Sequence, residues 1–160
     1  MLSPNAYFWL FAGQLAAAWF MTGLIWVIQL VHYPLFDQVS PERFVAFEKL
    51  HAQRITWIVG PVMLLELALA VGCFAAAPTA DLRSWCLAAG LLLAACWVTT
   101  AALSVPAHNK LAAAWSADAH RSLVDTNWIR TVCWTARGVL LVAILPKVVR
   151  YVFSTPAVSG

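Results

Sequence analysis

The chain alternates between four long apolar segments and shorter, more polar connectors. The apolar segments cover approximately residues 6–31, 55–77, 85–105 and 128–153. Each is near or above the roughly 20 residues that an α-helix needs to cross the hydrocarbon core of a bilayer. Backbone polar groups in lipid must be satisfied within the segment, and no alternation of period two indicates a β-barrel. The pattern therefore predicts four transmembrane helices.

These helices are expected to form an all-α, four-transmembrane-helix bundle of two helical hairpins, a single membrane domain over residues 1–160. Because successive spans alternate in direction, connectors 32–54 and 106–127 share one side, which we call the wide face. The 78–84 hairpin and both termini share the other side, the narrow face. Helix-start residues, such as Pro41 at a first helical position, predict a short helical extension in each wide-face connector.

Two prolines, Pro34 and Pro106, mark where regular helix is expected to end in the first and third spans. Proline lacks the amide donor and disfavours helix in the residue before it. The first span is too long for the apolar region of a signal peptide and has no positive charge before it, so we expect a retained helix.

Composition supports a membrane protein. Hydrophobic residues make up 62% of the chain and charged residues 11%, and the mean hydropathy is +0.78, far from the composition of a soluble domain. The net charge of +3 comes from scattered basic residues. This distribution provides no footprint for a nucleic acid, so membrane lipids are the expected partners.

Lysine and arginine are more frequent near the wide face. The positive-inside rule therefore predicts a multi-pass protein of the bacterial inner (cell) membrane, with the wide face in the cytoplasm and the termini outside. Cys73 and Cys86 approach the narrow face and could form a disulfide if that face is oxidising. Packing as small apolar groups is the alternative role for these thiols.

All four histidines of the chain fall at the wide face, which is the main clue to function. Neutral imidazole is a common ligand for zinc, copper and iron. We predict a copper or iron site whose ligands are His32, His51 and His108, with His120 as the weakest candidate. Haem b held by two of the first three is an alternative, and so is general-base chemistry without a metal. The four could also collect in the longer connectors without a shared role.

Glu48 precedes His51 by three residues, a spacing that di-iron helical bundles use. The chain lacks the second such motif and the further glutamates, so a standard di-iron centre is disfavoured. We nevertheless assign Glu48 to the candidate catalytic group together with His32, His51 and Arg130.

Polar side chains recur at helical spacing on one face of each span. Polar groups avoid lipid, so these faces predict a polar cavity that opens toward the wide face. Arg54, Arg130 and Asn127 are expected to position the polar end of an apolar substrate, and Asn109 and Trp128 complete the candidate substrate-binding residues with Arg54 and Asn127. Three deeper tryptophans could line a flat pocket for an aromatic ligand or simply pack: Trp26, Trp97 and Trp134.

Glu66 and Arg137 lie deep in the second and fourth spans. Counted from Arg54 and Asn127 at 1.5 Å per residue, both descend roughly 15–18 Å below the wide face. A lone charge at that depth is costly, so we predict a buried Glu66–Arg137 ion pair at the cavity floor.

Two stretches of the second half, Val105–Leu111 (VPAHNKL) and Leu123–Thr131 (LVDTNWIRT), resemble the DUF1772-like family of small four-helix membrane proteins, which includes anthrone oxygenases. The likeness depends on five positions: Pro106, Asn109, Asn127, Trp128 and Arg130. In the first half, Gln29–Phe36 and His51–Arg54 resemble a group of uncharacterised bacterial membrane proteins with the same fold. The resemblance implies oxidation of an apolar aromatic substrate by dioxygen, with an anthrone-like carbon becoming a quinone carbonyl.

Two functions of different classes follow from the sequence. The first is a membrane oxidoreductase of oxygenase type with a histidine-lined site for a metal or haem and a small apolar aromatic or quinone-like substrate. The alternative is a non-catalytic small subunit or lipid-binding scaffold that self-associates or joins a larger membrane complex. Alanine-rich runs such as Ala16–Ala18 permit close helix contact and fit either function.

Overall fold

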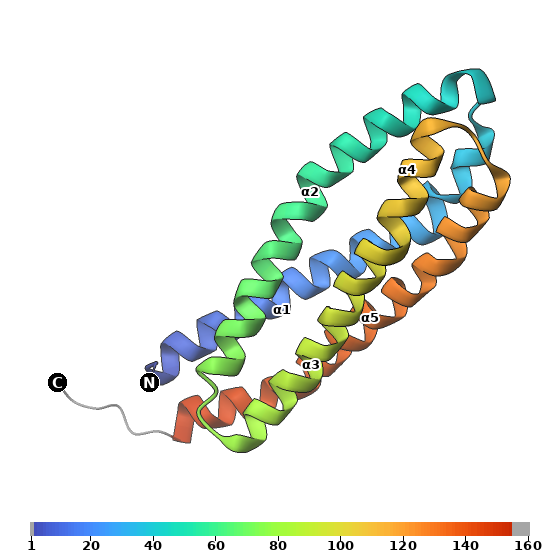
Figure 1. Ribbon diagram of the computed structural model, residues 1–160. Coiled ribbons are helices and arrows are strands. Elements are labelled where there is room, and N and C mark those ends of the chain that lie inside the picture. Colours follow the sequence, from blue (N-terminus) through green and yellow to red (C-terminus); the bar gives the residue numbers. More distant parts are fainter. Residues whose placement is uncertain (1, 155–160) are drawn as a thin grey trace.

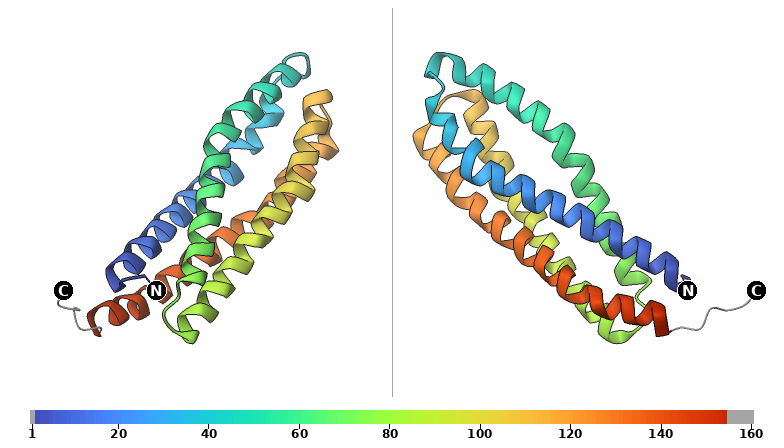
Figure 2. Two further views of the ribbon diagram at one scale, coloured as in Figure 1. Left: turned by 60° about the vertical axis from the view of Figure 1, so that its left-hand side comes forward. Right: turned by 180° about the vertical axis from the view of Figure 1, so that it is seen from behind.

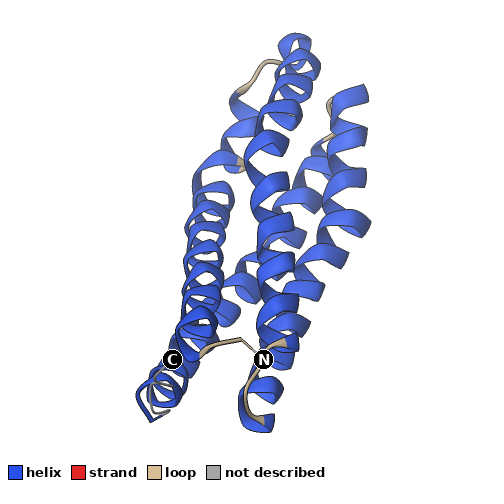
Figure 3. Cartoon of the chain, turned by 90° about the vertical axis from the view of Figure 1, so that its left-hand side faces the viewer, coloured by secondary structure: helices blue, strands red, loops and turns tan. Residues whose placement is uncertain are grey.

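The computed structural model describes residues 2–154, and within that range every regular element is a helix (Figures 1 and 3). In chain order the elements are α1 (Pro4–Val27), the π-helical segment η1 (Ile28–His32), the 3-10 segment η2 (Pro34–Gln38), α2 (Pro41–Ala75), α3 (Ala80–Thr99), the π-helical segment η3 (Thr100–Ser104), α4 (Val105–Ala113) and α5 (Ala117–Ser154). The prediction of an all-α, four-helix bundle is confirmed.

The four long helical stretches are apolar enough to cross a membrane. They cover 35, 35, 34 and 38 residues, counting η1 and η2 with α1, and η3 and α4 with α3. These lengths exceed the roughly 20 residues that a bilayer requires. The excess lies largely in the wide-face connectors, where α2 begins at Pro41 and α5 at Ala117, which confirms the two predicted helical extensions.

The connectors and the chain ends lie at the two ends of the bundle that the sequence predicts for them. Figure 1 shows the N-terminus, the end of α5 and the α2–α3 hairpin at one end, and the η2–α2 and α4–α5 connections at the other. The views in Figure 2 show α1 and α5 running side by side in opposite directions. Across this interface Thr22 donates to the carbonyl of Trp134 at 3.1 Å, and Trp26 Nε1 donates to Thr135 at 3.0 Å.

The core consists of two apolar clusters at different depths. The cluster toward the wide face includes Phe36, Phe44 and Trp134. The cluster toward the narrow face includes Tyr7 and Phe11. Large apolar side chains also cover the outside of the bundle, as expected for helices in contact with lipid.

One detail of the predicted helix ends is wrong. Pro34 does begin a change of structure, from η1 to the 3-10 segment η2, but Pro106 lies in the first turn of α4 and the helical path continues to Ala113. A proline in the first turn of a helix is tolerated because amides there lack intrahelical acceptors. The π-helical segment η3 just before it lets the chain continue without a break.

Candidate functional site

A continuous chain of hydrogen bonds crosses the wide-face half of the bundle. Its centre is His108 of α4, whose Nδ1 lies 2.5 Å from the Oε1 atom of Glu48 in α2. His108 Nε2 lies 3.0 Å from the hydroxyl of Tyr33. A carboxylate accepts only, so Nδ1 donates to Glu48, and with its single ring proton on Nδ1 the imidazole of His108 accepts from the Tyr33 hydroxyl at Nε2. Glu48, His108 and Tyr33 therefore form a carboxylate–imidazole–phenol relay.

Arg130 of α5 is the cation of this site. Its NH2 group donates to the Tyr33 hydroxyl at 3.2 Å, and its NH1 group donates to Thr100 at 3.3 Å. Arg130 is 6% exposed and Glu48 is fully buried. The buried carboxylate and guanidinium are therefore joined through a phenol and an imidazole.

Amides hold the guanidinium of Arg130 in position. Asn127, one turn earlier on α5, accepts from Arg130 through its side-chain oxygen, with a distance of 3.0 Å to Nε. Asn127 Nδ2 donates to Gln29 at 2.7 Å, and Gln29 Nε2 donates to the Val124 carbonyl at 3.2 Å. Because both amides have partners at both ends, their orientation is fixed by the network.

Local backbone structure explains how these side chains meet. Gln29 and His32 belong to the π-helical segment η1, and Thr100 and Ser104 belong to η3. A π-helical turn has one more residue than an α-helical turn and therefore rotates the following side chains around the helix. Tyr33, directly after η1, is 3% exposed.

His32 and His51 form a separate pair beside the relay. His32 Nε2 and His51 Nδ1 lie 2.8 Å apart, so one of the two nitrogens carries a proton and the other accepts it. The ring centroids of His51 and His108 are 5.5 Å apart. Three of the four predicted histidines therefore lie in one cluster at the wide face.

His120, the fourth histidine, supports the backbone of Tyr33. Its Nε2 donates to the Tyr33 carbonyl at 2.8 Å, and its ring stacks on Phe36 with a centroid distance of 6.1 Å. Trp115 covers another part of the imidazole, with a centroid distance of 5.2 Å. These contacts attach the start of α5 to the segment that carries Tyr33.

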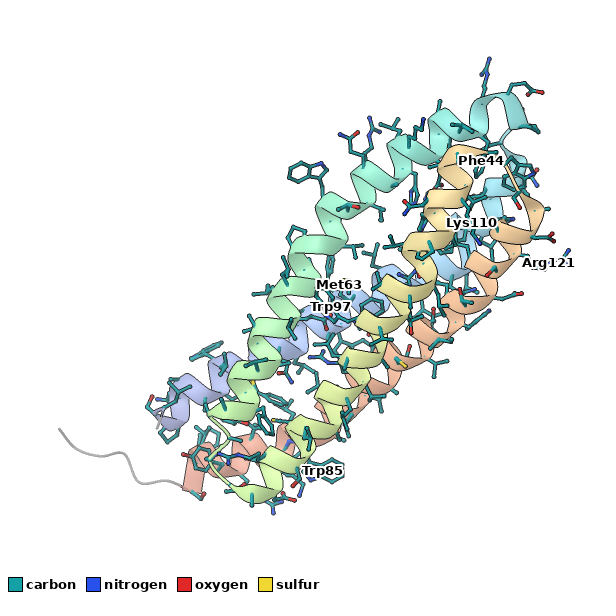
Figure 4. All side chains as sticks on the ribbon, viewed as in Figure 1. Phe44, Met63, Trp85, Trp97, Lys110 and Arg121 are labelled. Atoms are coloured by element: carbon teal, nitrogen blue, oxygen red, sulfur yellow. The ribbon has the colours of Figure 1, made fainter. Side chains whose placement is uncertain are left out.

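A cavity of about 250 Å³ lies inside the bundle against the relay. Its polar end contains Tyr33, His108 and Arg130, and its remaining wall is mainly apolar. Met63 of α2 and Trp97 of α3, which also line it, lie close together between these helices in Figure 4. Trp134 belongs to the lining as well, so two of the three tryptophans considered for a flat pocket are placed there.

This cavity reaches the outer surface between α2 and α4. Its lining includes the exposed residues Thr56 on α2 and Val105 on α4. Both helices belong to stretches apolar enough to span a membrane. A ligand can therefore reach the relay from the side of the bundle.

The metal site predicted at the histidines stays a prediction. Within residues 2–154, no group of three or more histidine, cysteine, aspartate or glutamate side chains is placed to hold one metal ion. Both nitrogens of His108 have hydrogen-bond partners, and His32 and His51 bind each other. Among the described side chains, His51 Nε2 has no hydrogen-bond partner, whereas His120 Nε2 donates to the Tyr33 carbonyl.

All four residues expected to bind substrate lie outside the cavity lining. Arg54 lines a different, outward-facing groove between α1 and α2. Asn109 is exposed on α4. Trp128 is 41% exposed, and its ring lies edge-on to Trp26, with a centroid distance of 5.7 Å. Asn127 is the fourth of these residues, and its side-chain oxygen accepts from Arg130, which does line the cavity.

Glu66 and Arg137 form the ion pair that their depth predicts. Arg137 NH1 lies 2.7 Å from Glu66 Oε1, and both side chains are fully buried. The second carboxylate oxygen accepts from Trp134 Nε1 at 3.0 Å. Since Trp134 lines the cavity, the pair lies directly behind the cavity wall.

Tyr33 is the residue of this hydrogen-bond relay that the sequence patterns did not single out. Its position next to His32 was visible, but only the π-helical turn and the fold bring its hydroxyl to His108 and Arg130, far away in sequence. Gln29 was visible as part of a polar helix face, yet its contact with Asn127 also depends on the fold. The two narrow-face thiols, Cys73 and Cys86, are free and buried in the structure.

Comparisons with known proteins give no family. No protein-family model, curated protein or solved structure matches the chain. The resemblance to the DUF1772-like family therefore stays a prediction from the residues quoted above. Function has to be inferred from the site itself.

Proposed function

We propose that this chain is an integral membrane oxidoreductase of oxygenase type that removes a proton from a compact, apolar aromatic substrate. The observation that supports this most directly is the Glu48–His108–Tyr33 relay, which ends on an apolar cavity within the membrane-spanning bundle. A buried carboxylate that orients an imidazole is the arrangement that general-base catalysis uses.

The cavity limits the size of the substrate. Pockets for drug-sized ligands enclose roughly 300–1,000 Å³, whereas this cavity measures about 250 Å³. A compact fused aromatic ring system is therefore a better match than a complete phospholipid. The opening between Thr56 and Val105 suits a substrate that arrives dissolved in the bilayer.

The relay can take a proton from the substrate through Tyr33. The Tyr33 hydroxyl passes its proton to His108 Nε2, and the resulting imidazolium is stabilised by Glu48 at 2.5 Å. The phenolate oxygen of Tyr33, held by the Arg130 guanidinium, then takes a proton from an acidic carbon of the substrate. Arg130 also stabilises the negative charge that develops on a substrate oxygen near Tyr33.

Dioxygen completes the proposed reaction. The substrate carbanion adds to dioxygen and takes up one proton from the relay, which gives a carbon hydroperoxide. Loss of water from this group leaves a carbonyl, so that a CH2 group and O2 become C=O and H2O. Copper, iron or haem at His32, His51 and His108 stays a separate prediction, and none of these steps depends on it.

Turnover of anthrone by the detergent-purified protein tests the proposal. An oxygen electrode and the quinone absorbance should give one dioxygen consumed for each quinone formed, above the rate without protein. Tyr33→Phe and His108→Gln should each reduce this rate about 100-fold, within the range of general acid–base catalysis. Tyr151→Phe, far from the cavity near the end of α5, is the matched control and should keep the parent rate.

Two results would overturn the proposal. One is a parent rate equal to the rate without protein. The other is an unchanged rate in both Tyr33→Phe and His108→Gln. Absence of turnover together with stoichiometric copurification of one other membrane protein would instead support the non-catalytic subunit.

A further inference from the structure

A second hollow lies on the outside of the bundle, between α1 and α2. It is a groove of about 370 Å³, and its rim and floor include Val27, His32, Leu50, His51, Arg54 and Ile58. Three of its apolar side chains are strongly exposed, Val27 by 56%, Leu50 by 46% and Ile58 by 47%. The groove therefore faces outward, where a membrane-spanning bundle meets lipid.

Polar and apolar side chains occupy opposite ends of this groove. His32, His51 and Arg54 lie at the wide-face end, and Leu24 and Ile58 lie farther toward the middle of the bundle. From His32 to Leu24 the helix descends about 12 Å, at 1.5 Å per residue. The groove thus combines a short polar head region with an apolar channel long enough for the upper part of an acyl chain.

Arg54 gives the head region a positive charge that the protein itself does not balance. It is exposed, and among residues 2–154 none of the three ion pairs includes it. An arginine at the interface attracts anionic lipid headgroups, and its planar donor group suits phosphate oxygens. The unpaired cation therefore favours a phosphate over a neutral or cationic headgroup.

His51 adds a second polar group at the same end. Its Nε2 is buried and has no hydrogen-bond partner. When His32 Nε2 donates to His51 Nδ1, neutral His51 carries its proton on this unpartnered Nε2 atom. A buried donor without a partner is costly, and an acceptor at the head of the groove would remove that cost.

We infer that the α1–α2 groove is a binding site for an anionic phospholipid. The phosphate contacts Arg54 at the wide-face end, beside His32 and His51, and one acyl chain follows the apolar groove past Val27 and Ile58. The site is independent of the proposed oxygenase reaction, because Tyr33, His108 and Arg130 do not line it. It assigns Arg54 to a lipid rather than to the substrate.

Native mass spectrometry of delipidated protein titrated with phosphatidylglycerol or phosphatidylcholine tests this inference. One phosphatidylglycerol should bind in preference to phosphatidylcholine. Arg54→Gln should weaken this binding about fivefold, the contribution of one basic residue near a membrane surface. Arg43→Gln, an exposed arginine on the same helix outside the groove, is the matched charge control and should leave binding within a factor of two of the parent.

A second pair of variants tests the apolar channel without changing charge. Val27→Trp should fill the groove and reduce bound phosphatidylglycerol. Val31→Trp, an equally exposed position at 53% that does not line the groove, should leave it unchanged. Folding of each variant is checked by far-UV circular dichroism before the titration.

Several outcomes would overturn the inference. Equal loss in Arg43→Gln and Arg54→Gln would mean diffuse attraction to the wide face. Equal binding of phosphatidylcholine would remove the role of charge, and displacement of the lipid by millimolar inorganic phosphate would indicate a simple anion site. Displacement by anthrone would assign the groove to the substrate.

Discussion

The Glu66–Arg137 pair gives the sharpest test of the energetics of this bundle. Arg137 NH1 donates to Glu66 at 2.7 Å, while Arg137 Nε and NH2 have no partner. Glu66→Met would therefore leave a fully buried guanidinium without any of its observed hydrogen bonds. Breaking a buried pair by removing one partner costs about 3–5 kcal/mol, and we expect the free energy of unfolding to fall by an amount near the upper end.

The reverse change should cost less. In Arg137→Met the carboxyl group of Glu66 keeps its bond with Trp134 at 3.0 Å, and a carboxyl, unlike a guanidinium, can bind a proton and become neutral. We expect a loss of about 3 kcal/mol for this variant. The double variant replaces both charges by apolar groups and should lie within about 1 kcal/mol of the parent or be more stable.

Reversible unfolding by sodium dodecyl sulfate in mixed micelles, followed by tryptophan fluorescence, measures all three variants. The exposed Asp81–Lys147 pair, with an N–O distance of 2.8 Å, is the control. Its double replacement by Asn and Met should leave the midpoint unchanged, because exposed pairs contribute little. The reasoning is refuted if the double Glu66/Arg137 variant loses the sum of the two single losses.

Three further predictions concern the wide-face site. Asn127→Ala should lower the free energy of unfolding by about 1–3 kcal/mol, because Gln29 and Arg130 each lose a buried partner. The control is Ser122→Ala, an exposed change on the same helix. An equally small loss in both variants would contradict this role of Asn127. His120→Ala should weaken anthrone binding, measured by tryptophan quenching, because the Tyr33 backbone loses its support; unchanged affinity would show that Tyr33 is held without it. If copper or iron copurifies stoichiometrically, His32→Ala and His51→Ala should each remove it in elemental analysis, and retention of the metal would place its ligands elsewhere.

Much of the fold could be predicted from the sequence because the constraints are local. A segment in lipid must satisfy its own backbone, so apolar length alone predicts a helix, and alternation of spans fixes which connectors share a face. Counting residues from the wide face down each span also predicts that Glu66 and Arg137 lie at the same depth. The helical extensions at Pro41 and Ala117 also follow from residues next to them in the sequence.

The site was only partly predictable, because its pairings depend on helix rotation. The sequence indicates that the histidines share a face, but it leaves open whether they form a common ligand set or only collect there without a shared role. The rotation of side chains at η1 and the approach of α2 to α4 place Glu48 within hydrogen-bond distance of His108. His32 forms its hydrogen bond with His51 instead. No helical periodicity predicts a π-helical turn, so Tyr33 could not be assigned in advance.

The sequence by itself determined four apolar helices, their alternating directions, the polar character of the wide face and the depth of its buried charges. The tertiary structure decided which nitrogen meets which oxygen, that Arg54 faces an outer groove, and that the cavity ends on a phenol. The physical reason is range: hydrophobic burial and backbone hydrogen bonding act along each segment, whereas a hydrogen bond requires two side chains from different helices to meet within about 3 Å.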